Sequence, residues 1–112
     1  MTIASVVTEA LAARLPFSLV EGVAHELATS PESVALEASK AIAIGFMGGV
    51  YTWSEADLAM NRLHAAFAIQ SRFLSGLAYD IYSAFDDGEI PAEDGESRTR
   101  VRLAALGAQL GA

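Results

Sequence analysis

The sequence predicts an all-α protein: a compact bundle of about five helices around one long central helix, in a single domain over residues 1–112. Apolar residues recur at intervals of three and four positions, as on one face of a helix, and they seldom alternate as in a strand. Prolines and glycines divide this pattern into segments of helical length. Hydrophobic residues make up 53% of the chain and its mean hydropathy is +0.36, which is enough apolar surface for one core without disulfides.

The first two predicted helices lie on either side of Pro16. Helix one spans residues 3–14, because Pro16 cannot continue a helix that began earlier. Helix two begins at Ser18, where a capping box with Glu21 is expected, and it ends near Thr29. The apolar stripe of the first helix consists of Ile3, Val6, Val7, Ala10 and Leu11.

The third predicted helix has a strong start signal. Ser30 provides a capping hydroxyl, and Pro31 suits the first helical position because proline has no amide hydrogen to leave unpaired there. The helix runs to about Met47 and ends at two consecutive glycines. One of its faces is small enough for a neighbouring helix to approach closely, and it consists of Ala38, Ala41, Gly45 and Gly49.

The long central helix is predicted to begin near Ser54 and to run to about Phe85. Ser54 and Asp57 are expected to form a capping box, with Trp53 packed against Leu58. At 1.5 Å per residue, this helix would be about 45 Å long. Its apolar positions form a heptad seam, which consists of Met60, Leu63, Phe67, Gln70, Leu74, Leu77, Ile81 and Ala84.

A helix of this length exceeds what packing within a small domain requires. A homodimer through the long helix is therefore one hypothesis. Gln70 is the one polar residue in the seam, and a buried glutamine needs partners for its amide. We therefore expect Gln70 to set the register between helices. A last helix is predicted over residues 97–110.

Charge is distributed unevenly along the chain, which carries 14 acidic residues, 7 basic residues and a net charge of −7. Residues 1–97 hold four bases and fourteen acids, a balance of −10, whereas residues 98–112 carry +3 from Arg98, Arg100 and Arg102. Half of all the acids lie within seventeen positions that contain no base: Asp80, Asp86, Asp87, Glu89, Glu93, Asp94 and Glu96.

This acidic segment has two interpretations. It is either a solvated loop, whose repulsion the following arginines reduce, or a surface that engages a basic partner through charge pairing. Arg72, Tyr79 and Tyr82 are expected on the polar face of the long helix, opposite the seam. Tyrosine and arginine are residue types that anchor protein interfaces, so these three join the seven acids as candidate partner-binding residues.

A calcium-binding loop in the acidic segment is excluded by its details. Counted from Asp86, the third and fifth ligand positions are Gly88 and Ile90, which offer no carboxylate. The twelfth position is Ser97, where a bidentate glutamate belongs. We therefore predict no metal in this segment.

The remaining chemical motifs are also incomplete. The chain has no cysteine, and His25 and His64 stand in no metal-binding spacing. The glycine-rich stretch at residues 45–49 lacks the lysine and hydroxyl of a phosphate-binding loop. No nucleophile elbow is present. The sequence therefore predicts a protein that is not an enzyme and takes no cofactor.

Net charge and hydropathy bear on partners and location. An acidic chain with scattered bases is not expected to bind DNA or RNA directly. The longest uncharged stretch, residues 41–54, is too short to cross a bilayer, and the first residues do not form a basic leader. We expect no membrane association and a cytoplasmic location.

These observations favour a noncatalytic protein-binding module. Small acidic helical proteins of this class include immunity proteins, nucleic-acid mimics and phage-encoded inhibitors such as anti-CRISPRs, and the likeness is one of class alone. The expected partner is a protein that is basic or that handles nucleic acid. The alternatives are a self-associating structural or adaptor protein, and a helical enzyme or ligand carrier with a pocket near His25, His64 or Gln70.

Overall fold

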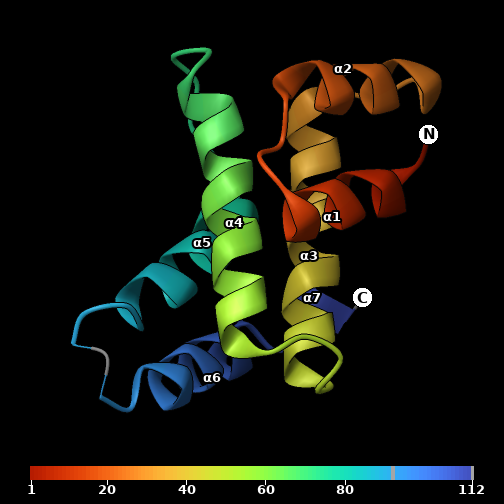
Figure 1. Ribbon diagram of the computed structural model, residues 1–112. Coiled ribbons are helices and arrows are strands. Elements are labelled where there is room, and N and C mark those ends of the chain that lie inside the picture. The colour runs from red at the N-terminus through yellow and green to blue at the C-terminus, as the bar shows by residue number, and fades with distance from the viewer. Residues whose placement is uncertain (92, 112) are drawn as a thin grey trace.

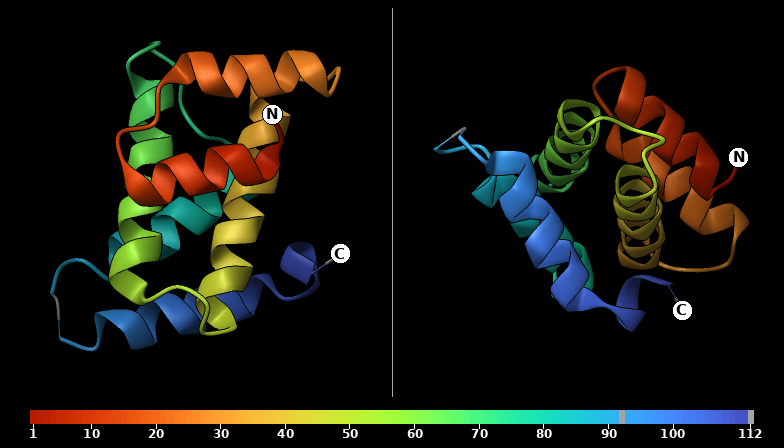
Figure 2. Two further views of the ribbon diagram at one scale, coloured as in Figure 1. Left: turned by 45° about the vertical axis from the view of Figure 1, so that its right-hand side comes forward. Right: turned by 90° about the horizontal axis from the view of Figure 1, so that it is seen from below.

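The computed structural model describes residues 1–91 and 93–111, and within these ranges it contains seven helices and no strand (Figure 1). The all-α prediction is confirmed. Viewed along α3 and α4 in Figure 2, right, these two helices stand side by side, with α1 and α2 on one side and α5 and α6 on the other. The bounds are α1 Ile3–Ala12, α2 Phe17–Glu26, α3 Pro31–Met47, α4 Trp53–Ala68, α5 Gly76–Asp87, α6 Gly95–Leu106 and α7 Ala108–Gly111.

Helix α3 is the structural centre of the molecule. Its predicted bounds are confirmed, and its start is capped as expected, because the Ser30 hydroxyl accepts a hydrogen bond from the Ser33 amide at 3.1 Å. It packs against α1, α2, α4, α5 and α7. Its buried stripe repeats every four residues, as the geometry of a helix requires, and consists of Val34, Ala38, Ile42 and Phe46.

The prediction of one long central helix is wrong. The segment forms two helices, because α4 ends at Ala68 in a left-handed turn at Ser71, which has φ +54°. The Arg72 amide donates to the Phe67 carbonyl at 3.0 Å and the Ser71 amide to the Ala68 carbonyl at 2.9 Å, the hydrogen bonds of a Schellman motif. The chain then reverses direction, and α5 packs against both α3 and α4.

The predicted heptad seam is divided between these two helices and serves the core of a single chain. Met60, Leu63 and Phe67 are buried from α4, and Ile81 and Ala84 from α5. The homodimer hypothesis assumed one long helix with a free seam, and the described residues form neither. Gln70 lies exposed in the turn between α4 and α5, so the role predicted for it, setting the register of a buried seam, is also wrong.

Neither predicted capping box forms where it was expected: the one of α2 is absent, and the one of α4 is shifted along the chain. Helix α2 begins one residue early, with Pro16 at its N-cap, so no capping box forms between Ser18 and Glu21. Helix α4 is capped by Thr52, whose hydroxyl accepts from the Glu55 amide at 3.1 Å. The Glu55 carboxylate in turn accepts from the Thr52 amide at 2.8 Å, which leaves Asp57 free for another contact.

The last predicted helix is interrupted near its end. Gly107, with φ +51°, separates α6 from the single turn of α7, and α7 packs against α3. The core beneath α6 contains Phe46 and Phe85, whose rings meet edge to face with centroids 5.4 Å apart. Within the described residues, no helix combines the length and the apolar character needed to span a bilayer.

Candidate acidic docking surface

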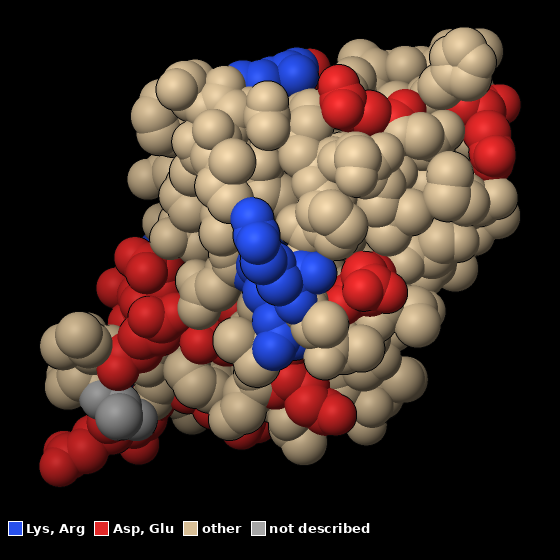
Figure 3. Space-filling model, turned by 45° about the horizontal axis from the view of Figure 1, so that its top comes forward, with Lys and Arg blue, Asp and Glu red and all other residues tan. Residues whose placement is uncertain are grey.

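The acidic residues of the predicted segment surround the connection between α5 and α6. Asp80, Asp86 and Asp87 lie on α5, Glu96 lies on α6, and the others lie between them or at the N-cap of α6. We call residues 88–94 the acidic turn, of which residue 92 lies outside the described residues. The chain leads from α5 into α6 at one corner of the molecule (Figure 1), and acidic side chains gather at that corner in the space-filling view (Figure 3).

The two ends of the acidic turn are held together by glycines. A Cβ placed on Gly95 would lie 2.0 Å from the carbonyl oxygen of Gly88. A Cβ placed on Gly88 would lie 2.5 Å from the Thr99 hydroxyl oxygen. Any side chain at either position would therefore collide with its neighbour, so the close crossing of α5 and α6 requires glycine at both.

Thr99 connects three helices beneath the acidic turn. Its buried hydroxyl donates to the Ala84 carbonyl of α5 and accepts from the indole nitrogen of Trp53 on α4, both at 2.9 Å. The sequence does not predict this hydrogen bond, and the packing of Trp53 against Leu58 stays a prediction. Because each of these groups is satisfied, the contact fixes α6 relative to α4 and α5.

Arg98 stabilises the backbone of the acidic turn. Its guanidinium donates to the main-chain carbonyl of Asp87 at 3.2 Å, and also to the carbonyls of Pro91 and Glu93. One of these acceptors is at the end of α5 and the other two are in the turn, so one side chain satisfies carbonyls that have no helical partner. Arg98 forms no ion pair within 4.0 Å with a carboxylate of the described residues.

The other two arginines neutralise only part of the acidic charge. Arg100 pairs with Glu96 at 3.3 Å, and its guanidinium carbon lies 4.4 Å from the centre of the Phe46 ring. Arg102 donates to the Ser83 carbonyl at 3.0 Å and reaches the Asp87 carboxylate only at 4.0 Å. Both ion pairs are exposed and are therefore weak in water.

Five of the seven acids of the segment form no ion pair with a base among the residues that the structure describes. One of the five is Glu89, and the other four are Asp80, Asp86, Glu93 and Asp94. All four side chains are exposed. Asp94 occupies the left-handed region, with φ +57°, at the N-cap of α6 and makes no side-chain capping bond. The surface therefore presents carboxylates to solvent on a backbone that Arg98, Thr99 and two glycines hold in place.

Glu89 is the one acid of the turn that faces the protein. It accepts a hydrogen bond from the Asn61 side-chain amide of α4 at 2.9 Å, and its carboxyl group lies within hydrogen-bonding reach of Asp57. Burial raises the pKa of Asp57 from 3.8 to about 7, reinforced by the hydrogen bond with Glu89 and by the negative charges of Glu89 and Asp86. Sequence reasoning missed this pair, because 32 positions separate its members.

The two predicted tyrosine anchors lie beside this cluster on α5. Tyr82 stacks on His64 of α4, with ring centroids 4.2 Å apart and planes 14° apart. Burial raises the pKa of Tyr82, and the charges of Asp86 and Glu89 add to the effect. Tyr79 is 47% exposed, and its ring centroid lies 6.1 Å from that of Tyr82. Of these two tyrosines, Tyr79 is therefore the one that a partner can reach.

Arg72 does not lie with these tyrosines, contrary to the prediction that placed them on one helix face. It follows the end of α4, forms an ion pair with Glu32, and stacks over the rings of Phe17 and Phe67. The break between α4 and α5 is the physical cause, because it removes the continuous helix on which Arg72 and Tyr79 would have shared a face.

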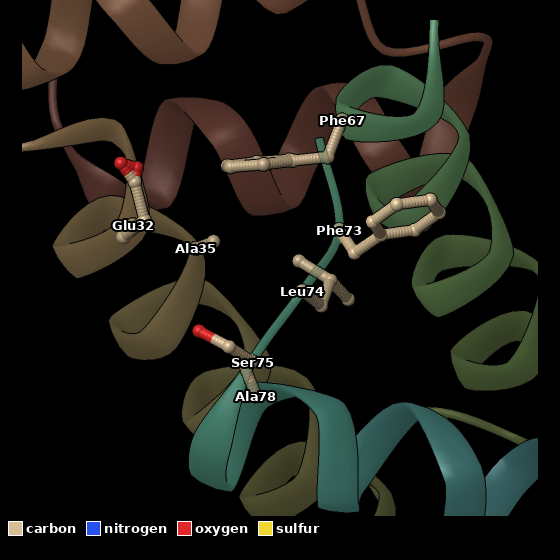
Figure 4. A pocket seen from close by; sticks show the side chains of 7 residues that line it. All are labelled: Glu32, Ala35, Phe67, Phe73, Leu74, Ser75 and Ala78. Atoms are coloured by element: carbon tan, nitrogen blue, oxygen red, sulfur yellow. The ribbon is translucent and has the colours of Figure 1, made fainter. Parts of the chain in front are cut away.

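We call the exposed carboxylates of α5, the acidic turn and Glu96 the acidic surface. Two cavities formed by described residues are lined by none of these carboxylates. One of about 10 Å³, the size of a single water molecule, opens between α3, the end of α4 and the start of α5 (Figure 4). The other is an apolar groove of about 460 Å³ between the end of α3 and α6–α7, lined by residues that include Ile44, Met47, Leu103 and Leu110. Neither is lined by His25, His64 or Gln70, the residues predicted to line a ligand pocket.

No protein-family model, curated protein or solved structure matches this chain. Within the part of the chain that the structure describes, no three histidine, aspartate or glutamate side chains are arranged to hold a metal ion.

Proposed function

We propose that the protein is a noncatalytic binding module of the inhibitor or immunity class, which docks its acidic surface on a basic or nucleic-acid-handling protein. The observation that carries this proposal is the set of exposed carboxylates without basic partners on α5 and on the acidic turn that follows it, whose backbone is fixed by Arg98. A cytoplasmic location stays a prediction of the same proposal.

A fixed acidic turn suits docking for two physical reasons. Complementary charge steers a basic partner to the surface and disfavours acidic competitors. A backbone that is already ordered loses less conformational entropy when the complex forms, so more of the contact energy appears as affinity. Carboxylates held in this way can occupy positions at which a nucleic-acid-handling protein binds phosphates, because arginine forms bidentate hydrogen bonds with both groups.

Tyr79 offers a partner an aromatic contact in addition to the charge of the acids. Its ring is 47% exposed on α5, the helix that also carries Asp80, Asp86 and Asp87. Tyrosine anchors are enriched at the centres of interfaces, and an aromatic face attracts the guanidinium of a partner arginine. Tyr79 together with the exposed acids therefore favours an arginine-bearing partner surface.

The proposal is tested with an arginine-rich peptide as the probe, by calorimetric titration at about 0.05 M and about 0.5 M salt. Reversing Asp86→Lys together with Glu93→Lys should weaken binding at low salt by about tenfold or more. The matched control reverses Glu21→Lys together with Glu37→Lys, two exposed acids remote in sequence from the turn, and changes the net charge equally.

The two charge reversals separate local docking from the attraction of net charge. Equal losses in both double variants would contradict a dedicated surface, because only the overall charge would then matter. Binding of the wild type that persists unchanged at the higher salt concentration would contradict charge-based docking altogether.

A further inference from the structure

Glu89 joins the acidic turn to α4. It follows Gly88, the C-cap of α5, and is therefore the first acidic residue of the turn. Its side chain is half-buried, whereas Glu93 and Asp94 are exposed. The hydrogen bond from Asn61 at 2.9 Å spans 28 positions of sequence and brings the Glu89 carboxylate onto the side of α4.

Asp57 lies one helical turn before Asn61 on α4 and reaches the same carboxyl group. One of its oxygens, Oδ1, is buried without a hydrogen-bond partner in the described residues. The groups that face it are Glu89 in the turn and Asp86 and Tyr82 on α5, all acidic or phenolic. His64, further along α4, stacks on Tyr82. No lysine or arginine of the described residues forms an ion pair with Asp57.

Two carboxyl groups in contact without a cation attract each other only when one of them carries a proton. We infer that Asp57, Asn61 and Glu89 form a proton-dependent latch that holds the start of the acidic turn against α4. In the closed state a single proton is shared between Asp57 and Glu89, while Asn61 donates to Glu89. Loss of that proton leaves two carboxylates in contact, beside Asp86, and their repulsion opens the latch.

The direction of the pH response follows from the pKa of Asp57, which is raised from 3.8 to about 7. The folded chain therefore holds a proton that the unfolded chain releases in this interval. The stabilisation that the shared proton gives the latch is complete below pH 3.8, is lost progressively as the pH rises from 3.8 through 7, and is absent above pH 7. Because the latch belongs to the free protein, it can be tested whether or not the proposed docking function is correct.

The test is amide hydrogen exchange measured by NMR and expressed as protection factors, which remove the intrinsic pH dependence of exchange. The probe is the Glu89 amide, which donates to the Asp86 carbonyl at 3.1 Å at the start of the turn. Loss of the shared proton opens the latch and exposes the Glu89 amide to exchange. The protection factor of this amide should therefore fall by about tenfold between pH 6 and pH 8.

Three variants give the comparison. Asp57→Asn keeps a hydrogen-bond donor toward Glu89 without a titratable proton, so its Glu89 amide should stay protected at pH 8. Glu89→Gln removes the repulsion from the other side and should behave in the same way, which provides a second test if Asp57→Asn fails to fold. Asp80→Asn removes an exposed acid of α5 that does not touch the latch, and it should follow the wild type.

The latch is contradicted by either of two results. The first is wild-type protection that does not change between pH 6 and pH 8. The second is the same pH-dependent fall in both Asp57→Asn and Glu89→Gln as in the wild type, because such a fall would come from a group outside the latch. Weak peptide binding together with a normal pH response would instead leave the latch intact and count against docking alone.

Discussion

The centre of α3 and the acidic turn are ordered by different forces. Val34, Ile42 and Phe46 are fully buried on one stripe of α3 and belong to the hydrophobic core. The acidic turn has no such core and depends on Arg98, Thr99 and two glycines for its shape. Substitutions in the buried stripe of α3 should therefore lower the stability of the fold strongly, whereas substitutions of exposed side chains in the turn should leave it nearly unchanged.

The largest effect is expected at the centre. Phe46→Ala removes a fully buried ring that packs edge to face on Phe85, and it should lower the free energy of unfolding by about 3–5 kcal/mol. Urea denaturation followed by circular dichroism measures this. Ile44→Ala, two positions earlier and 49% exposed, is the control and should cost under about 1 kcal/mol. Similar losses in both variants would contradict the central position of α3.

The next effect tests the close crossing of α5 and α6. Gly95→Ala places a Cβ 2.0 Å from the Gly88 carbonyl oxygen, so the backbone must shift, at a cost of about 1–3 kcal/mol. Thermal unfolding measures the loss. Gly111→Ala is the matched control, because a Cβ at that position meets nothing within 4 Å. A stability of Gly95→Ala equal to that of the wild type would show that the helices do not cross so closely.

A comparable or smaller loss is expected at the buried hydroxyl that joins three helices. Thr99→Val keeps the shape of the side chain but leaves the Trp53 indole N–H and the Ala84 carbonyl without partners, which should cost about 1–3 kcal/mol. Trp53 fluorescence during unfolding is the natural readout. Thr99→Ser retains the hydroxyl and should lose less than Thr99→Val; the reverse order would show that packing, rather than hydrogen bonding, holds α6.

The smallest effect on stability concerns pH. Asp57→Asn should be more stable than the wild type above pH 7, by on the order of 1 kcal/mol after allowance for its partial exposure to water. The advantage should shrink as the pH falls from 7 toward 4, because the wild-type carboxyl group then binds its proton. Melting temperatures of the two proteins across this range measure the difference. A constant difference at all pH values would mean that Asp57 does not titrate in this window.

The local features of the fold could be predicted from the sequence, and the tertiary ones could not. The bounds of α3 follow from Ser30 and Pro31 and from the glycines after Met47, which act within a few residues. The end of α4 was missed because Ser71 adopts the left-handed conformation that glycine or asparagine usually marks. Without that signal, the continuing apolar spacing predicted one helix where the core requires two.

In the candidate site, too, the local features could be predicted from the sequence and the tertiary contacts could not. The grouping of the acids is a property of the sequence, and the structure leaves Asp86 and Glu93 exposed and without ion pairs in the described residues. The hydrogen bonds of Arg98 could not be predicted, because their acceptors are main-chain carbonyls that come together only when the turn has formed. The contact between Asp57 and Glu89 was hidden for the same reason: it depends on how α4 and α5 pack.

The most direct test of the docking surface is a map of where an arginine-rich peptide binds, obtained from backbone amide shifts in a two-dimensional NMR titration. The account predicts the largest shifts at residues 79–91 and 93–96, and their loss at about 0.5 M salt. The segments around Glu21 and Glu37 carry exposed acids as well and should barely move. Shifts of equal size in those segments, or shifts that persist at high salt, would contradict the assignment of this corner as the docking surface.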